Sequence, residues 1–342
     1  MSTATPYVRP TMNRQFVLAS RPSELPDDST FGMVTSPVPE LKGGELLVRA
    51  MYLSVDPYMR GRISHARSYA APVEIGGVMV GGGAGRVIES RNPDFALGDI
   101  VEIYMGWQEY AVSNGKGLRK LDPSVPVPVS LGILGGTGLT AYFGLLDVCD
   151  PKPGETVVVS GAAGATGSVA GQIAKIKGCR TVGIAGSAEK IDWLTRECGF
   201  DGAFDYKTTA DYSAKLQELS PKGIDVYFDN VGGPITDAVL PLINTGARIA
   251  ICGQISQYNN TKPQLGPRLL HHLIIGRAKM QGFLVTDYAP RFAGAIAELA
   301  NWYRAGRLKS REDIVEGFEN LPRAFIGLFK GENTGKRLVK LE

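Results

Sequence analysis

A glycine-rich segment in the middle of the chain constrains the fold more than any other feature. Gly161, Gly164 and Gly167 are spaced three residues apart, after the apolar run Thr156–Ser160 and before the helix-like run Gln172–Lys177. A strand, a glycine turn and a helix in this order let the backbone approach a pyrophosphate, whose charge rests on free N–H groups at the helix N-terminus. The segment therefore predicts a dinucleotide site. Because the spacing differs from Gly-x-Gly-x-x-Gly, a β–α turn without a ligand is the alternative.

The residues after the next apolar run, Thr181–Ala185, indicate which dinucleotide is bound. A site that prefers NAD places Asp or Glu at the end of this strand, where the carboxylate holds the ribose 2′-hydroxyl. Here the strand ends in Gly186 and Ser187, and Lys190 follows on the first turn of the next helix. A hydroxyl and a cation in place of the carboxylate favour a 2′-phosphate, so the sequence predicts NADPH. A solvated surface lysine is the alternative interpretation of Lys190.

Beyond this point, strand-like and helix-like segments alternate as in a doubly wound parallel sheet. The expected helices cover residues 189–198, 212–219, 234–243, 268–275 and 290–305, and the expected strands cover 202–207, 224–229, 247–252 and 279–285. Ligands of such sheets lie across the carboxyl ends of the strands. We therefore expect Tyr206, Asn230, Gly253 and the loop 254–260 to line a cofactor cleft.

The first part of the chain differs, with short strands between Gly and Pro turns. Strands are expected at residues 45–50, 85–89, 99–103 and 107–112, and again after the last helix at 314–318 and 336–340. This predicts an α/β protein in which a Rossmann domain, residues 129–305, is inserted in a mostly β, partly open barrel formed by residues 1–128 and 306–342. The length of 342 residues suits two domains.

Composition excludes several classes of function. A net charge of +3 without a basic run argues against nucleic acid as a partner. The uncharged stretch Thr156–Ala174 is broken by Ser160 and Gly161, so no membrane span is expected. Residues 1–13 are polar and lack a signal segment. The cysteines are far apart, which suits the reducing cytoplasm; they are Cys149, Cys179, Cys198 and Cys252.

Several segments together resemble the medium-chain dehydrogenase/reductase superfamily, and within it the zinc-free prostaglandin reductase and alkenal/enone reductase branch, including bacterial curcumin-reductase-like members. The resemblance covers nearly the whole chain and implies a GroES-like first domain. It rests on Ser54–Arg60, Gly138–Tyr142, Ala163–Gly167, Tyr227–Gly233, Ile251–Asn259 and Glu316–Asn320.

Zinc-dependent relatives use Cys and His-Glu ligands in the first domain. This chain has no Cys near Ser54–Asp56 and no His-Glu pair in Gly76–Gly81. Its three histidines are His65, His271 and His272, and the adjacent pair is expected on a Rossmann helix. We therefore expect no catalytic metal.

The resemblance implies a set of NADPH-binding residues. Gly164 to Gly167 would hold the pyrophosphate, Lys190 and Tyr206 the 2′-phosphate end, and Asn230, the loop from Cys252 to Tyr258 and Asn333 the nicotinamide half. The expected cofactor residues are Gly164, Ala165, Thr166, Gly167, Gly186, Ser187, Lys190, Tyr206, Asn230, Cys252, Gly253, Gln254, Ile255, Ser256, Tyr258, Phe283, Leu284, Val285 and Asn333.

Without a metal, reduction of a conjugated C=C bond needs a donor for the enolate oxygen. A tyrosine hydroxyl is such a donor at neutral pH. The resemblance points to Tyr258, with Tyr58 as a second candidate; each has a structural role as the alternative. The expected activity is NADPH-dependent reduction of α,β-unsaturated aldehydes or ketones by a cytoplasmic enzyme, in the family's homodimeric form. A quinone reductase and a non-catalytic NADPH-binding protein are the alternatives.

Overall fold

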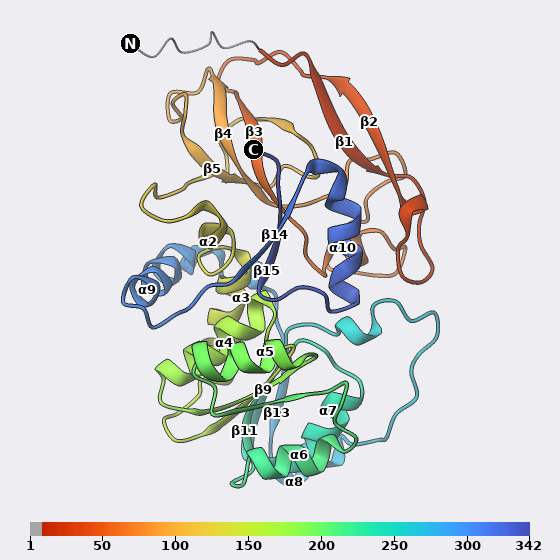
Figure 1. Ribbon diagram of the computed structural model, residues 1–342, viewed down its shortest axis with the longest axis vertical. Helices are drawn as coiled ribbons and strands as arrows, with labels where there is room; N and C mark the ends of the chain where they lie inside the picture. The colour runs from red at the N-terminus through yellow and green to blue at the C-terminus, as the bar shows by residue number, and fades with distance from the viewer. Residues whose placement is uncertain (1–8) are drawn as a thin grey trace. The chain divides into compact units, whose positions relative to one another are not determined.

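The computed structural model describes residues 9–342, which form two compact units. The β-rich unit comprises the described residues up to Val127, together with Ile314–Ile326 and Leu338–Glu342. The parallel-sheet unit comprises Pro128–Asp313 and Gly327–Arg337. The chain therefore enters the parallel-sheet unit once through a long segment and returns to it through a short one (Figure 1).

The parallel-sheet unit is built on six parallel strands in the order β10-β9-β8-β11-β12-β13. The strands are β8 (Thr156–Ser160), β9 (Arg180–Ala185), β10 (Gly202–Asp205), β11 (Ile224–Asp229), β12 (Ile243–Ile251) and β13 (Lys279–Gly282). β9 and β10 extend to one side of β8, and β11, β12 and β13 extend to the other, so the chain changes direction between β8 and β11. In doubly wound sheets this switch point is where ligands bind.

Alternation along β9 explains how the sheet is covered on both faces. Val182 and Ile184 point into one apolar cluster, which also contains Leu216 and Val239 from the helices of that face. Gly183 faces the other way, where a Cβ would lie 3.0 Å from Phe200. Successive residues of a strand face opposite sides, so both faces of the sheet are buried and its strands are almost continuously apolar.

Each strand of this sheet is followed by a helix, as a doubly wound sheet requires, and two further helices precede the first strand (Figure 1). The helices are α2 (Val127–Leu131), α3 (Gly136–Phe143), α4 (Ala165–Ile176), α5 (Ala188–Asp192), α6 (Tyr212–Leu219), α7 (Pro234–Val239), α8 (His271–Gly276) and α9 (Phe292–Arg304), with π-helical turns at Gly144–Cys149 and Trp193–Glu197 and 3-10 turns at Leu240–Leu242, Ile255–Gln257 and Val285–Arg291.

Several expected element boundaries differ from the structure; for example, the strand expected at 202–207 ends at Asp205, and the one expected at 247–252 spans Ile243–Ile251. The last strand ends at Gly282 rather than at residue 285, because Gly282 pairs with Ile251, the final residue of β12, and the ladder has no partner beyond it. Val285 instead begins a 3-10 turn and packs against the cluster around Phe143. The final helix begins at Phe292 rather than at residue 290, since Pro290 lies within that turn.

The β-rich unit contains a seven-stranded, mainly antiparallel sheet and a two-stranded one. The large sheet has the order β14-β15-β3-β4-β5-β7, with β6 paired to β3, and the small sheet pairs β1 with β2. The strands are β1 (Met12–Leu18), β2 (Phe31–Pro37), β3 (Leu46–Ser54), β4 (Gly83–Ser90), β5 (Ile100–Ile103), β6 (Tyr110–Ser113), β7 (Arg119–Lys120), β14 (Glu312–Glu316) and β15 (Lys336–Lys340). The short elements are a 3-10 turn at Asp28–Thr30, α1 (Met59–Arg62), a 3-10 turn at Phe318–Asn320 and α10 (Leu321–Phe329).

A tryptophan lies at the centre of the β-rich core. Trp107 is fully buried, and its ring contacts those of Phe31 and Phe325 with centroids 5.3 and 5.8 Å apart. Phe325 lies on α10, within the segment Ile314–Ile326 of the β-rich unit, so this C-terminal segment completes the core. The expected fold class is confirmed: a Rossmann sheet is inserted in a mostly β unit.

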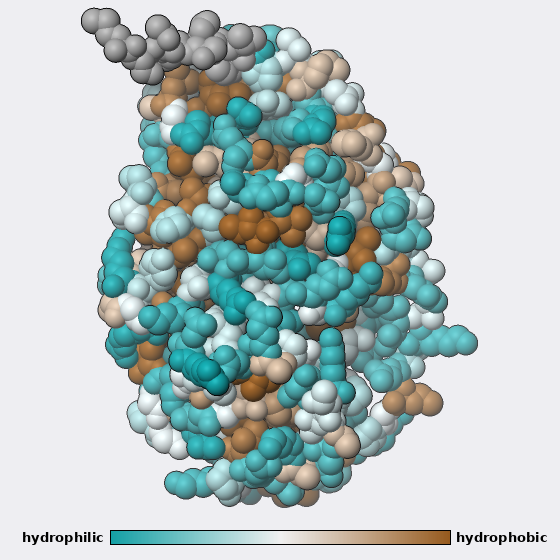
Figure 2. Space-filling view, in the orientation of Figure 1, coloured by the Kyte–Doolittle hydropathy of each residue, from teal (hydrophilic) through white to brown (hydrophobic). Residues whose placement is uncertain are grey.

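The outer surface shown in Figure 2 is mixed, with apolar areas broken by polar ones, as is usual for a globular protein. Within residues 9–342, none of the helices has the length and apolar character needed to cross a membrane.

Candidate cofactor site and active site

All the expected cofactor residues except Asn333 are gathered at the carboxyl edge of the parallel sheet, because they lie in the segments that follow its strands. Gly161 follows β8, and the residues directly after the next five strands are Gly186, Tyr206, Asn230, Cys252 and Phe283. Segments far apart in the sequence therefore meet at one edge of one sheet.

The glycine loop is shaped by close backbone contacts. Gly161 has a φ of 58°, which favours glycine. A Cβ on Gly167 would lie only 2.4 Å from the Gly161 carbonyl oxygen. Gly164 is the N-cap of α4 and offers no side-chain cap. Helix geometry leaves the first N–H groups of α4, at Ala165, Thr166 and Gly167, without intrahelical partners, so this end fits a pyrophosphate.

Lys190, the residue expected at the 2′-phosphate end, is not a solvated surface lysine. It is only 9% exposed, and its Nζ donates to the Gly331 carbonyl oxygen at 2.6 Å. Burial, with the nearby charge of Lys207 second, lowers the pKa of Lys190 below its ordinary value. A buried ammonium held by a neutral carbonyl gains from a dianion beside it.

The neighbours of Lys190 complete this end. Ser187 caps α5, and its Oγ accepts from the Lys190 N–H at 3.3 Å, which leaves the hydroxyl proton for another acceptor. Gly186 lies against the ring of Tyr206, since a Cβ there would be 2.8 Å from Tyr206 Cε1. The same ring is near the returning segment, where a Cβ on Gly331 would be 3.9 Å from Tyr206 Oη.

The returning segment Gly327–Arg337 also contacts the glycine loop. The Gly335 N–H donates to the Ala163 carbonyl at 2.7 Å, and Gly164 forms an isolated parallel bridge with Gly335. Asn333 Nδ2 donates to the Gly335 carbonyl at 3.0 Å. Asn333 is thereby held beside the loop that fits the pyrophosphate.

On the other half of the edge, the turn after β11 supports the loop after β12. Asn230 is fixed to β8, with its N–H 2.9 Å from Ser160 Oγ and its Nδ2 2.7 Å from the Ser160 carbonyl. The Asn230 carbonyl accepts from the Ile255 N–H at 3.3 Å. Ser256 Oγ donates to the Val231 carbonyl at 2.6 Å. Burial raises the pKa of the half-buried Cys252 to about 12, so its thiol stays protonated.

Tyr258 lies in this loop with its hydroxyl turned back toward the backbone. The Gln254 N–H donates to Tyr258 Oη at 3.2 Å, and a Cβ on Gly253 would be 3.3 Å from the same oxygen. Burial raises the pKa of Tyr258 above its ordinary value, although the hydrogen bond from Gln254 lowers it in part. Because the oxygen accepts from the backbone, its own proton is available for another acceptor.

The remaining predicted residues differ in how they present side chains. Phe283 packs against Phe228, with ring centroids 6.4 Å apart, and Val285 packs into the cluster around Phe143. Their side chains support the unit, and Leu284 occupies the N-cap position of the 3-10 turn that follows, without a side-chain hydrogen bond. Residues 283–285 therefore offer a ligand their backbone groups and not their side chains.

Tyr58 belongs to the β-rich unit, whereas Tyr258 belongs to the parallel-sheet unit. The Tyr58 hydroxyl donates to Tyr104 Oη at 3.4 Å. Burial, with the charge of Asp56 second, raises the pKa of Tyr58 well above its ordinary value. Tyr58 is thus also protonated at neutral pH.

Sequence reasoning missed the residue that organises this edge, Asp229. It ends β11, is fully buried, and its carboxylate accepts hydrogen bonds from both neighbouring loops. A signal was present, because an acidic residue at the end of an apolar strand needs several donors to be buried. The second missed residue is Gly331, whose carbonyl holds Lys190 from 141 positions away.

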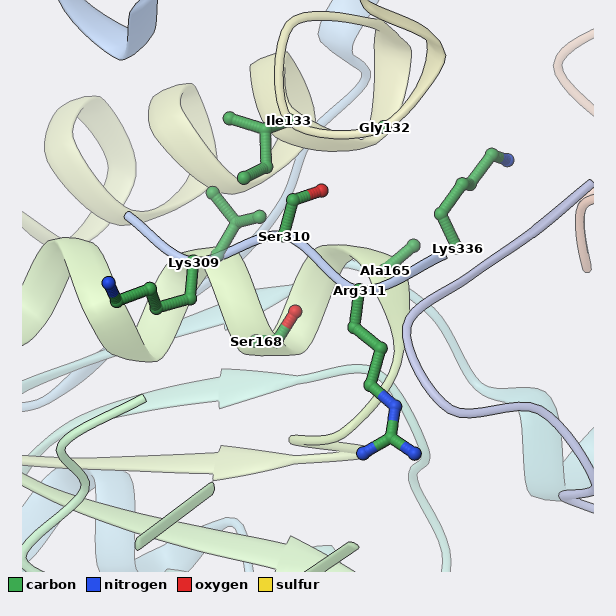
Figure 3. Close-up of a pocket in the computed structure, with 9 residues that line it drawn as sticks. Gly132, Ile133, Ala165, Ser168, Lys309, Ser310, Arg311 and Lys336 are labelled. Carbon is green, nitrogen blue, oxygen red and sulfur yellow. The ribbon is translucent and has the colours of Figure 1, made fainter. Parts of the chain in front are cut away.

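A small cavity of about 10 Å³ lies beside the first turn of α4 (Figure 3). In Figure 3 the Ser168 hydroxyl points toward Ser310, whereas the guanidinium of Arg311 points away. The volume is about that of one water, so the cavity is not a substrate pocket. Its lining is Gly132, Ile133, Ala165, Ser168, Val169, Lys309, Ser310, Arg311 and Lys336.

Among residues 9–342, no three His, Cys, Asp or Glu side chains are grouped closely enough to hold a metal ion. His271 and His272 lie on α8, with ring centroids 4.0 Å apart.

Comparisons with known proteins agree with this architecture. Residues 14–121 match the family model described as the N-terminal domain of oxidoreductase, and residues 165–301 match the one described as zinc-binding dehydrogenase. The chain is 47% identical to the NADPH-dependent curcumin reductase of Escherichia coli over 335 residues, which are 96% of this chain and 97% of that one. It is 46% identical to prostaglandin reductase 1 of Rattus norvegicus over 320 residues, 92% of this chain and 95% of that one.

A solved structure is similarly close. The crystal structure of CurA from Vibrio vulnificus in complex with NADPH has a TM-score of 0.92 at 48% identity, and the match covers 96% of this chain and 99% of that one.

Proposed function

The chain belongs to the zinc-free double-bond reductase branch of the medium-chain dehydrogenase/reductase superfamily, and we propose that it uses NADPH to reduce the conjugated C=C bond of α,β-unsaturated aldehydes and ketones. Relatives that are named as NADPH-dependent curcumin reductase and prostaglandin reductase support the cofactor and the type of substrate. The carrying observation in this chain is the Tyr258 hydroxyl, which accepts from the backbone and keeps its proton for an enolate oxygen.

The carboxyl edge of the parallel sheet fits NADPH. The uncapped N-terminus of α4 at Gly164–Gly167 would hold the pyrophosphate, and Lys190 and Tyr206 the 2′-phosphate. Asn230, the loop Cys252–Tyr258 and Asn333 would hold the nicotinamide half, together with backbone groups of residues 283–285. When bound, NADPH supplies the hydride that reduces the β-carbon of the substrate.

Tyr258 then has a defined role in the chemistry. Reduction at the β-carbon places negative charge on the carbonyl oxygen, and a donor that is already oriented stabilises this charge without reorganisation. Burial holds the pKa of Tyr258 above its ordinary value, so the phenol is protonated when it is needed. The α-carbon takes its proton from solvent. The product retains the carbonyl and has gained one hydride and one proton across the former double bond.

The substrate side of the proposal lies in the first part of the chain. We propose that the β-rich unit is the substrate domain, with Tyr58 as the candidate second donor, and that the parallel-sheet unit is the NADPH domain. The segments 306–313 and 327–337, which the sequence assigned to the substrate domain, belong to the parallel-sheet unit. Asn333, on the returning segment, contributes to the cofactor site.

The same proposal includes a homodimer formed through the parallel sheets. β13 is an edge strand of the sheet, and edge strands pair readily with a second chain. On the adjacent α8 segment, Leu270, Ile274 and Ile275 are 67%, 79% and 67% exposed. A second copy would bury these residues by twofold symmetry. The change Ile274→Glu should give a monomer in light scattering, and an unchanged dimer would contradict this interface.

A cytoplasmic location completes the proposal. Cys149, Cys179 and Cys198 are buried, and Cys252 is half-buried; all four are free thiols, as expected in a reducing compartment.

The test is NADPH oxidation with a 2-alkenal, a conjugated aryl ketone and a quinone, each repeated with NADH. The proposal requires turnover of the enal or enone with NADPH. Turnover of the quinone alone would make the protein a quinone reductase, and tight NADPH binding without turnover of any of the three would make it a binding protein.

A further inference from the structure

Asp229 is the most heavily hydrogen-bonded buried acid of the site, and the chemistry above does not use it. Its Oδ1 accepts from Ser160 Oγ at 2.8 Å and from Tyr227 Oη at 2.9 Å. Its Oδ2 accepts from Thr236 Oγ1 at 2.7 Å. An ionised carboxylate is purely an acceptor, which suits this many donors.

The same carboxylate shapes the turn that carries Asn230. Oδ1 also accepts from the N–H groups of Val231 and Gly232, each at 2.9 Å. The turn requires Gly232 and Gly233 with φ of 71° and 61°, a conformation that the two N–H bonds hold in place. The position of Asn230 against Ser160 follows from this turn.

Asp229 also holds the loop after β12. Gln254 Nε2 donates to Oδ2 at 3.1 Å, and the N–H groups of Cys252 and Gly253 donate to the Asp229 carbonyl at 2.8 and 3.0 Å. The backbone N–H of the same Gln254 donates to Tyr258 Oη. The carboxylate is therefore joined to the Tyr258 hydroxyl through one residue.

We propose that Asp229 is the positioning residue of this site, because its carboxylate fixes the turn after β11 and the loop 252–258 relative to each other and so sets the orientation of the Tyr258 hydroxyl. Asn230 comes from the turn after β11 and Tyr258 from the loop after β12. Because the buried Asp229 carboxylate is hydrogen-bonded to both segments, it fixes the distance between Asn230 and Tyr258. The role of Tyr258 in this statement rests on the proposed function.

The test uses the variant Asp229→Asn, which preserves the shape of the side chain but replaces one acceptor oxygen by a donor NH2 group. Asp225→Asn is the matched control, because Asp225 lies at the other end of β11 and accepts from the Thr156 N–H and from Asn244 Nδ2, each at 2.8 Å. Each variant loses a carboxylate that joins one end of β11 to neighbouring segments, but only the Asp229 carboxylate lies at the end of β11 that faces the site.

Hydrogen exchange of the ligand-free proteins and NADPH binding provide readouts that need no substrate. In Asp229→Asn, residues 230–233 and 252–258 should exchange about tenfold faster, and NADPH should bind about tenfold more weakly, while Asp225→Asn stays within about twofold of wild type in both. Unchanged exchange in these two loops would overturn the proposal. So would a uniform increase throughout the parallel-sheet unit, which would show a general stability effect.

If Asp229→Asn does not fold, Gln254→Ala removes one donor and leaves the carboxylate. Faster exchange confined to residues 252–258 is then expected, and no change there would overturn the proposal.

Enone turnover separates the positioning role from the proposed function. If Asp229 acts through Tyr258, its replacement should lower kcat about tenfold in the wild type and less than about threefold in a Tyr258→Phe background. Equal losses in both backgrounds would overturn the coupling. Failure of the wild type to reduce any enone would refute the proposed function, while exchange and NADPH binding would still decide whether Asp229 positions the loops.

Discussion

Replacing Tyr258 by Phe removes the hydroxyl that we assign to the enolate oxygen and keeps the ring that packs in the loop. Removing one oriented donor from a charge that develops in the transition state costs about 100- to 1000-fold in kcat. We expect a loss near the lower limit, about 100-fold. The Gln254 N–H, which donates to the Tyr258 hydroxyl at 3.2 Å in the wild type, remains in the variant and can donate to the enolate oxygen in part.

The effect on stability should be much smaller than the effect on the rate. The Gln254 N–H loses its hydrogen-bond partner, which costs about 1–3 kcal/mol if no water replaces it. Tm should then fall by a few degrees, because about 1 kcal/mol shifts Tm by about 2–4 °C in a domain of this size.

The assay is single-turnover oxidation of bound NADPH by an aryl enone, so that product release does not hide the chemical step. Tyr142→Phe is the control, because the Tyr142 hydroxyl donates to Glu298 at 2.5 Å in the same unit and has no role in the proposed site. The control should keep its rate within about twofold. A Tyr258→Phe rate within about threefold of wild type would refute the assignment of the hydroxyl as the enolate donor.

Three further predictions follow from the same geometry. Lys190→Met should weaken NADPH binding about 10- to 100-fold and leave NADH binding unchanged in fluorescence titrations, since we propose that the buried Lys190 ammonium holds the 2′-phosphate, which NADH lacks; equal losses for both would contradict it. The turnover rate should stay constant from about pH 7 to about pH 9, because burial raises the pKa of Tyr258 above the ordinary tyrosine value and the donor is lost only as pH rises through this raised pKa; a decline below pH 9 would count against a tyrosine donor. Gly171→Ala should lower stability by about 1–3 kcal/mol in thermal unfolding, since its Cβ would lie 1.9 Å from Phe200 Cζ, whereas Gly294→Ala, in open space on α9, should raise it by about 0.5–1 kcal/mol.

Much of the fold follows from local sequence signals. Strands β8 and β11 and helix α6 have the bounds that the sequence predicts, because each is an apolar or amphipathic run with Gly, Asp or Ser directly beside at least one end. The boundary at Gly282 could not be found this way, since it depends on where the neighbouring strand β12 ends. Strand pairing is a property of two segments, and a single segment does not encode it.

The candidate site also has features that local sequence signals predict and features that they do not. Its location at the carboxyl edge is predictable, because the topology of a doubly wound sheet places every strand end there. The contact between Lys190 and Gly331 joins segments 141 residues apart, and nothing in the local pattern around either residue indicates it. The network at Asp229 likewise needs β8, α7 and the two loops after β11 and β12 in register, so the sequence indicates only that this acid must find donors.

The central claim is that this chain reduces the C=C bond of an enone and leaves the carbonyl intact. The most direct test is reduction of an aryl enone with NADPH deuterated at C4 of the nicotinamide, followed by mass spectrometry and NMR of the product. We expect a saturated ketone that carries one deuterium on the β-carbon and takes its α-proton from solvent. Deuterium on the carbonyl carbon of an allylic alcohol would contradict it.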